Sequence, residues 1–209
     1  WLPKFKKLTD AVDIFVDEGY FDTQDGETLL SQAQKLRIPI KIHADELKLT
    51  GGSDLAVKYQ ALSADHLLCI GSNEIQKLAQ SEVTATLLPT TAYYLKAAYA
   101  PARELLSAGA RVALASDYNP GTSPTHDLAL LGNLAALYLG MRIDEIIVGM
   151  TLNGAYALGL QNRKGALLPG YDADIIMFEA ASPAQLFYEF GQRRSSITQV
   201  LTFGRILKI

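Results

Sequence analysis

The stretch IKIHADELKLTGG, residues 40–52, joins a strand-like apolar run to a cluster of ionisable side chains. Its isoleucines are β-branched and alternate with other residues, which is typical of a strand with one buried face. His43, Asp45 and Glu46 follow at the end of this run, before a Gly-Gly break. Charged groups at the end of a buried strand are costly unless they are paired, hydrated or bound to a metal. The stretch therefore predicts either a core histidine with two solvated carboxylates or a functional site.

Similar strand-like runs recur along the chain, and helix-like segments separate them. Successive runs start roughly 20–30 residues apart, which is close to one βα unit of an α/β barrel. The predicted strands are residues 11–17, 38–44, 63–70, 83–89 and 111–117. Strands that alternate with helices predict an α/β fold with a parallel sheet whose faces are covered.

The pattern changes after Asp117. Residues 123–141 and 142–160 each predict a long helix, and from about Lys164 the chain turns to short strands and tight turns. We therefore expect a boundary near residue 160, with the α/β part in residues 1–160 and a small β-structure in residues 161–209.

Composition excludes some classes of function. The chain has 209 residues, of which 49% are hydrophobic and 20% charged, as in ordinary globular proteins. A net charge of −3 without a basic run argues against a nucleic-acid surface, and no apolar stretch is long enough for a membrane span. The single Cys69 lies in an apolar run, which predicts a buried thiol and favours a reducing cytoplasm.

Polar residues gather where the predicted strands end. In parallel α/β architectures, chemistry collects at the carboxyl ends of strands. His43, His66 and Asp117 occupy such positions on three different strands. Neutral imidazole and carboxylate are the usual ligands of Zn²⁺ and can also hold Fe²⁺. If the strands curl into a barrel, these residues predict a hydrolytic metal site in which the metal activates water and a carboxylate relays the proton.

Each of these residues also admits an ordinary role. His43 alone fits a hydrogen-bonded core histidine, and His66 fits a structural pair with Asp65. Asp117 fits the first residue of an Asn-Pro-Gly turn. We interpret His126, which follows a proline at a helix start, as a surface or capping residue.

Five motifs occur in a fixed order: HADE, ALSADHLL, LLPTTAYYL, SDYNPGTSPT and TLNGAYALG, at residues 43–46, 61–68, 87–95, 116–125 and 151–159. With this set the chain resembles the amidohydrolase superfamily and, more narrowly, the imidazolonepropionase family. That resemblance implies metal-dependent hydrolysis of the cyclic amide 4-imidazolone-5-propanoate to N-formimino-L-glutamate, in histidine degradation. It implies a small-molecule substrate and a Zn or Fe ion.

The resemblance also implies roles for single residues. His43 and Asp117 would be metal ligands, and Asp117 would pass a proton from the attacking water to the departing ring nitrogen. His66 would be a catalytic hydrogen-bonding group near that water, and Glu46 would contact substrate and assist proton transfer. The substrate pocket would be lined by Asn119, Gly121 and Thr122.

One departure from the family limits what this chain can do alone. The family also uses a His-x-His pair and further substrate-binding residues from the first half of its chain, and no His-x-His occurs here. The five predicted strands would then be strands 4–8 of a partial TIM-like (β/α)8 barrel, with part of a small β-sandwich. We expect the chain to be a carboxyl-terminal half that is inactive alone and binds metal weakly or not at all.

Such a half would leave two open sheet edges and a bare apolar barrel interior. We therefore expect it to pair with the missing amino-terminal half or with a second copy as a homo-oligomer. Two alternatives stay open. The chain could belong to another cyclic amidase or deaminase of the superfamily, or it could be a non-catalytic fragment that self-associates.

Overall fold

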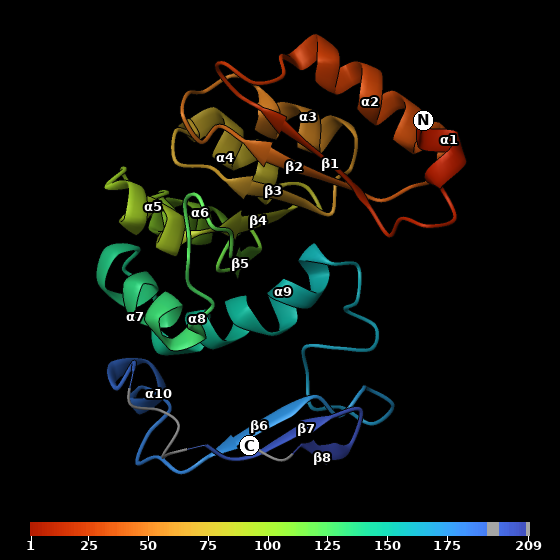
Figure 1. The fold of residues 1–209 in the computed structure, drawn as a ribbon. Helices are drawn as coiled ribbons and strands as arrows, with labels where there is room; N and C mark the ends of the chain where they lie inside the picture. The colour runs from red at the N-terminus through yellow and green to blue at the C-terminus, as the bar shows by residue number, and fades with distance from the viewer. Residues whose placement is uncertain (192–196, 208–209) are drawn as a thin grey trace.

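The computed structural model describes residues 1–191 and 197–207, and its elements fall into two sheets with helices around the first (Figure 1). The first sheet is parallel, has five strands and has the order β1-β2-β3-β4-β5. Its strands are β1 (Val12–Val16), β2 (Ile40–Ala44), β3 (Ser63–His66), β4 (Thr84–Leu87) and β5 (Val112–Leu114). Each lies within a predicted run, so the parallel α/β class is confirmed.

Helices cover one face of this sheet and bury its aliphatic side chains. On β1 and β2 the alternate residues Ile14, Val16, Ile40 and Ile42 belong to the same buried core as helix residues such as Leu30. The helices before β5 are α1 (Leu2–Phe5), α2 (Thr23–Leu36), α3 (Gly52–Lys58), α4 (Ser72–Ala79), α5 (Pro89–Leu95) and α6 (Ala102–Ala108). Period-two alternation on the strands therefore decides which face the helices cover.

The opposite face of the sheet is mostly polar, and the Phe15 ring lies there against the two histidines. Asp13 contacts His43 across β1 and β2, and Lys41 contacts Asp65 and Ser63 across β2 and β3. The partners of Ser63 and Asp65 on β4 are threonines. The expectation of a bare apolar interior is therefore wrong for these strands, because the sequence alternation places ionisable and hydroxyl side chains on this face.

The second predicted long helix is two helices. They are α8 (Ile143–Met150) and α9 (Leu152–Ala157), and Thr151 between them has φ −115° and ψ −89°, outside the helical region. The Thr151 hydroxyl donates to the Ile147 carbonyl at 2.6 Å, in addition to the bond from Thr151 N to the same carbonyl, and such side-chain bonding to the preceding turn often bends helices. Asn153 of α9 donates its side-chain amide to the carbonyl of Val112 in β5 at 2.8 Å, which ties α9 to the sheet.

The first predicted long helix is α7 (Leu128–Tyr138), and it begins where the Asp127 carboxylate accepts from Ala129 N and Leu130 N. Helix α10 (Gln185–Tyr188) packs on α7 through Phe187. A Cβ atom at Gly132 would lie 2.3 Å from the Phe187 ring, so this contact requires glycine.

The second sheet is antiparallel, with the order β6-β7-β8 (Figure 1). Its strands are β6 (Ile175–Phe178), β7 (Ile197–Thr202) and β8 (Arg205–Leu207). The described residues therefore contain the predicted short strands near the end of the chain. The domain boundary at residue 160 stays a prediction.

Two further expectations concern the surface. In the described part of the chain, no helix has the length and apolarity needed to cross a membrane. The prediction of a buried thiol is wrong, since Cys69 is exposed. Strand β3 ends at His66, where His66 and Leu67 have positive φ angles of 78° and 61°, and the turn carries Cys69 out of the core.

Candidate functional site

His43 near the end of β2, His66 as the last residue of β3 and Asp117 after β5 come together at the carboxyl ends of these strands. Each offers one ligand atom, and these three atoms all lie within 4.8 Å of one another. The rings of the two histidines are 5.2 Å apart, centroid to centroid. The structure thus brings together the three residues that the strand-end argument selected, while their roles stay predictions.

The backbone turns sharply where these strands end. Asp45, His66 and Asp117 have φ angles of 50°, 78° and 52°, a left-handed conformation that costs roughly 1–2 kcal/mol for a non-glycine residue. Such strained residues cluster at functional sites because the surrounding structure holds them there. All three are at or next to the residues that form the site.

Asp13 of β1 orients His43. The Nδ1 atom of His43 lies 3.1 Å from Oδ1 and 3.0 Å from Oδ2 of Asp13. This hydrogen bond raises the pKa of His43, against the opposing effect of burial. A carboxylate on one ring nitrogen fixes the tautomer and leaves Nε2 as the ligand atom. The sequence analysis does not select Asp13, because its place beside His43 depends on the register of β1 on β2.

His66 has a different environment from His43. It is 2% exposed, and burial together with the charge of His43 lowers its pKa to about 4. Its imidazole is therefore neutral at physiological pH, which is the form that binds metal. Its Nδ1 has no hydrogen bond among the described residues, and Glu46 Oε1 lies 3.4 Å away.

Glu46 is held close to these groups. Its side chain is 10% exposed. Burial raises its pKa, the nearby charge of Asp117 adds to the effect, and His43 opposes it. A carboxyl group with a raised pKa is suited to proton transfer near neutral pH. The alternative of two solvated loop carboxylates is wrong for both groups.

Asp45 is a structural carboxylate. It is fully buried and accepts backbone N–H groups from Thr50, Gly51, Gly52 and Ser53 at 3.0–3.2 Å. It therefore closes the loop after β2 onto the start of α3. A Cβ atom at Gly52 would lie 2.8 Å from Ala44 Cβ, so the close approach of this loop to β2 requires glycine.

Asp117 is fixed by Thr91, which follows β4. The Thr91 hydroxyl donates to Asp117 Oδ2 at 2.7 Å, and Thr91 is 2% exposed. This bond leaves Oδ1 of Asp117 available as a ligand or base. Thr91 lies in the motif LLPTTAYYL, but nothing in the sequence indicates which partner its hydroxyl has.

The loop after Asp117 uses its polar groups internally. Asn119 Oδ1 accepts from Gly121 N at 2.9 Å and from Thr122 N at 2.8 Å, and Asn119 Nδ2 donates to the Asp117 carbonyl. This arrangement is an Asx-type turn. The structure places Asn119, Gly121 and Thr122 beside the site, and their contact with substrate stays a prediction. His126 packs edge-on against Tyr118 instead of joining the cluster.

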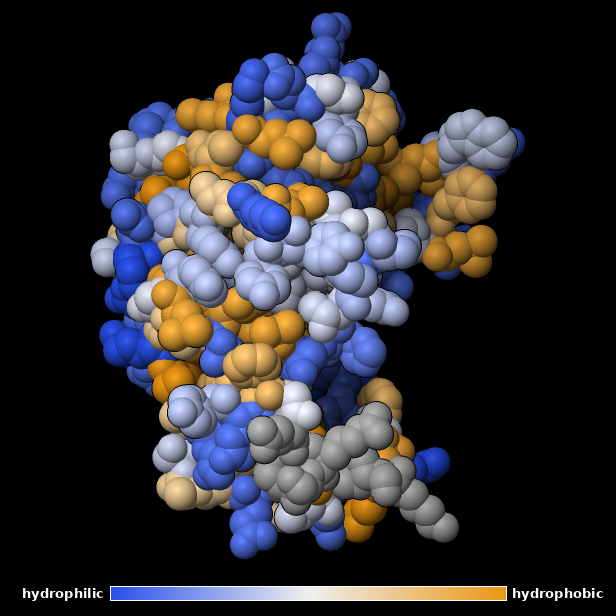
Figure 2. Space-filling model, turned by 60° about the vertical axis from the view of Figure 1, so that its left-hand side comes forward, coloured by the Kyte–Doolittle hydropathy of each residue, from blue (hydrophilic) through white to orange (hydrophobic). Residues whose placement is uncertain are grey.

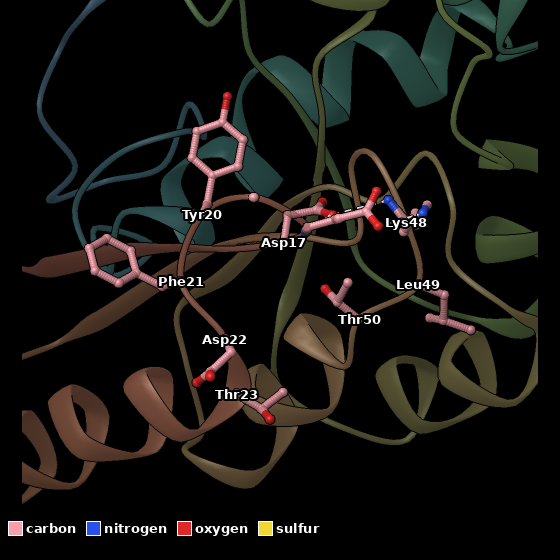
Figure 3. Close-up of a pocket in the computed structure, with 10 residues that line it drawn as sticks. Asp17, Tyr20, Phe21, Asp22, Thr23, Lys48, Leu49 and Thr50 are labelled. Carbon is pink, nitrogen blue, oxygen red and sulfur yellow. Dashed lines mark hydrogen bonds and ion pairs between the residues drawn. The ribbon is translucent and has the colours of Figure 1, made fainter.

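A cavity of about 350 Å³ lies next to this site, between the loops that follow β1 and β2 (Figure 3). Asp17, Tyr20, Phe21, Lys48 and Thr50 are among its lining residues. His43, His66 and Asp117 do not line it. The cavity therefore borders the loop that carries Glu46 instead of enclosing the three converging residues.

The residues present fit a divalent metal. Two imidazoles and one carboxylate are a frequent catalytic ligand set for zinc and for non-haem iron, and the buried His66 ring has a nitrogen without a hydrogen bond. Asp13, His43 and Asp65 form a second close set. In that set the Lys41 ammonium lies 3.2 Å from the Asp65 carboxylate and neutralises its charge, which makes this set less suited to a metal ion.

A sequence profile of the amidohydrolase family matches residues 20–207. The chain belongs to the amidohydrolase family. All the predicted site residues of this family member lie inside the matched range.

Imidazolonepropionases from several bacteria are similar to this amidohydrolase chain. The enzyme of Bdellovibrio bacteriovorus is 49% identical over 192 residues, 92% of this chain and 45% of that protein. That of Bacillus velezensis is 42% identical over 193 residues, 91% of this chain and 46% of that protein. That of Kosmotoga olearia is 36% identical over 206 residues, 99% of this chain and 50% of that protein. The resemblance is confirmed, and the chain spans about half the length of these relatives.

Solved structures of other proteins share the fold of this chain. An adenosine deaminase from Xanthomonas campestris with bound zinc has a TM-score of 0.80 at 19% identity, over 94% of this chain and 51% of that chain. The ochratoxinase of A. niger has a TM-score of 0.78 at 18% identity, over 98% of this chain and 52% of that chain. At this identity the likeness supports the fold and leaves the substrate open.

Proposed function

We propose that this chain supplies part of the active site of an imidazolonepropionase, which opens 4-imidazolone-5-propanoate with water to give N-formimino-L-glutamate. The observation that carries the proposal is the convergence of His43, His66 and Asp117, with Glu46 beside them, in a chain that is 49% identical to an imidazolonepropionase. The five parallel strands would be strands 4–8 of the (β/α)8 barrel, and β6–β8 would be part of the β-sandwich.

His43 and Asp117 are the proposed metal ligands, and the donor set also admits His66. The metal, Zn or Fe, would polarise the ring carbonyl and lower the pKa of water when bound. Asp13 keeps the His43 proton on Nδ1, and burial keeps His66 neutral. Each imidazole thus has a nitrogen lone pair that it can donate to a metal ion.

The proton path runs through Asp117. Its carboxylate takes a proton from the attacking water and returns it to the ring nitrogen as the C–N bond breaks. Thr91 holds one carboxylate oxygen so that the other faces the reacting atoms. Glu46 contacts the substrate and assists this transfer, His66 donates or accepts a hydrogen bond beside it, and the 119–122 loop lines the pocket. We place the reaction in the cytoplasm as part of the same proposal, since the single cysteine requires no oxidising compartment.

The test is reconstitution. The chain is co-expressed with the part of the B. bacteriovorus imidazolonepropionase that it does not match, and the assembled complex is assayed with Zn²⁺ or Fe²⁺ for addition of one water to the substrate. The matched control carries Asp117→Asn. We expect turnover with the wild-type chain and loss of turnover with the control.

The other outcomes discriminate between functions. Turnover of a different cyclic amide or an amino-substituted ring, without turnover of imidazolonepropanoate, would indicate another amidohydrolase activity. A well-formed complex that turns over none of these compounds would contradict an enzymatic role.

A further inference from the structure

Asp17, the first residue after β1, accepts hydrogen bonds from the loop that follows β2. Its Oδ2 accepts from Glu46 N at 2.7 Å and Leu47 N at 2.8 Å. Its Oδ1 accepts from Lys48 N at 3.0 Å and from its own neighbour Glu18 N at 2.7 Å. Figure 3 shows Asp17 reaching toward the loop that carries Lys48. One carboxylate therefore binds three consecutive amides of a different βα loop.

A carboxylate is required for this arrangement. Each oxygen of Asp17 accepts two N–H groups, and Asp17 is 4% exposed. An asparagine could accept at one atom only, and its own NH₂ group would face two N–H donors. Among the ion pairs of the described residues, none involves Asp17, so backbone dipoles stabilise its charge.

The hydrogen bonds from the amides of residues 46–48 to Asp17 attach the start of this loop to the end of β1. Asp45 holds the other end of the loop through residues 50–53. Glu46 is the first residue of the segment that Asp17 holds. Its carboxylate is 3.4 Å from His66 Nδ1, longer than an ordinary hydrogen bond. The position of that carboxylate therefore depends mainly on its backbone, and the backbone bond from Glu46 N goes to Asp17.

We propose that Asp17 is a positioning residue that holds the Glu46 backbone so that the Glu46 carboxylate faces the substrate beside His66. This inference rests on the proposed function for the role of Glu46. The hydrogen bonds between Asp17 and the amides of residues 46–48 do not depend on that function, and they can be tested without a turnover assay.

The first measurement is amide hydrogen exchange on the full chain. We expect slow exchange at Glu46, Leu47 and Lys48 in the wild type, faster exchange in Asp17→Asn by about tenfold for loss of a charge-assisted bond, and unchanged exchange at residues 50–53. The matched control is Asp174→Asn, since the Asp174 carboxylate, next to β6, also accepts a backbone N–H, from Phe203 at 2.8 Å in the turn between β7 and β8. If the wild-type amides at 46–48 exchange as fast as exposed loop amides, the proposal is overturned, even if Asp17→Asn does not fold.

The second measurement is a structure of Asp17→Asn, or of Asp17→Ser where the amide variant is unstable. We expect the Glu46 carboxylate to leave His66 Nδ1. A carboxylate that stays at its wild-type distance overturns the positioning role while leaving the proposed function intact.

The third measurement uses the reconstituted complex and a double-mutant cycle. We expect Asp17→Asn to lower kcat/KM by about tenfold with bound metal unchanged, and Glu46→Gln to cost less in that background than in the wild type. Additive effects of the two substitutions overturn the proposal. A wild-type complex without turnover contradicts the proposed function instead, and the first two measurements then decide on Asp17.

Discussion

The hydroxyl of Thr91 donates a 2.7 Å hydrogen bond to Oδ2 of Asp117. This bond joins the segment after β4 to the segment after β5, and it fixes one oxygen of the carboxylate in the candidate site. Its neighbour Thr90 donates at 2.7 Å to the carbonyl of Ser116. Thr90 and Thr91 are equally buried, and one donates to a neutral carbonyl while the other donates to a carboxylate. Substitution of Thr90 is therefore a matched control for substitution of Thr91.

Replacement of Thr91 by valine should reduce both stability and metal affinity. Loss of a bond to a charged group in a buried site should cost about 1–3 kcal/mol in the free energy of unfolding, and loss of a group that orients a ligand should weaken metal binding about 10–100-fold. Urea denaturation and metal titration of the reconstituted complex measure the two effects. Thr90→Val should lower stability alone, and equal metal affinities in the two variants would contradict the role of Thr91.

The Asp13–His43 bond predicts a pH dependence in the metal-free chain. Asp13 raises the pKa of His43, so the stabilising effect is present below the unfolded value of 6.5 and is lost as pH rises through the folded pKa. Asp13→Asn should therefore destabilise the chain more at pH 6 than at pH 9. Urea denaturation over this range tests it, and an equal loss at both pH values would rule out His43 as the linked group.

Metal binding should be weak in the chain alone. The described residues bring three donors together, and the His-x-His pair that the family resemblance implies is not in this sequence. After purification with added Zn²⁺ and brief dialysis against a chelator, we expect well below one metal per chain. Stoichiometric, chelator-resistant zinc or iron would show that the three residues suffice.

The isolated chain should associate with itself or aggregate. In the described residues β1 pairs only with β2 and β5 only with β4 in the sheet, so each leaves an edge. The face over α5 and α7 mixes apolar and polar groups, with Leu95, Leu128 and Leu137 exposed (Figure 2). Sedimentation measures the outcome. Because the inner face of the sheet is mostly polar, the prediction of self-association rests on the open edges of β1 and β5. A compact monomer at high concentration would contradict it.

Gly132→Ala should destabilise the contact between α7 and α10. The new methyl would lie 2.3 Å from the Phe187 ring, and such overpacking costs about 1–3 kcal/mol. The control is Gly154→Ala in α9, where the nearest atom would be 3.5 Å away and higher helix propensity should stabilise by up to about 1 kcal/mol. Thermal denaturation compares them, and similar melting temperatures for both variants would contradict the packing argument.

The sequence predicted the parallel sheet and the meeting of His43, His66 and Asp117. Both follow from local pattern: alternation selects strands, and parallel strands end at one edge. The partners of these residues were not predictable in the same way. Asp13 is 30 residues from His43 and Thr91 is 26 from Asp117, so each contact depends on strand register and turn geometry.

Three local predictions failed for identifiable reasons. The helix over 142–160 breaks at Thr151, whose hydroxyl satisfies a carbonyl of the preceding turn. Cys69 is exposed because the chain leaves β3 at the left-handed His66. Asp45 is buried because four backbone amides converge on it, and hydrophobicity patterns carry no information on such convergence.

The strand order of the first sheet equals the order of the strands along the chain, and this has a consequence for synthesis on the ribosome. Each strand that emerges finds its neighbour already made, one βα unit earlier, so the sheet can grow in one direction without waiting for distant segments. Short sequence separation between paired strands favours fast folding because little loop-closure entropy is lost at each step. Nascent chains halted after β3, β4 and β5 should therefore already protect the paired strands that they contain.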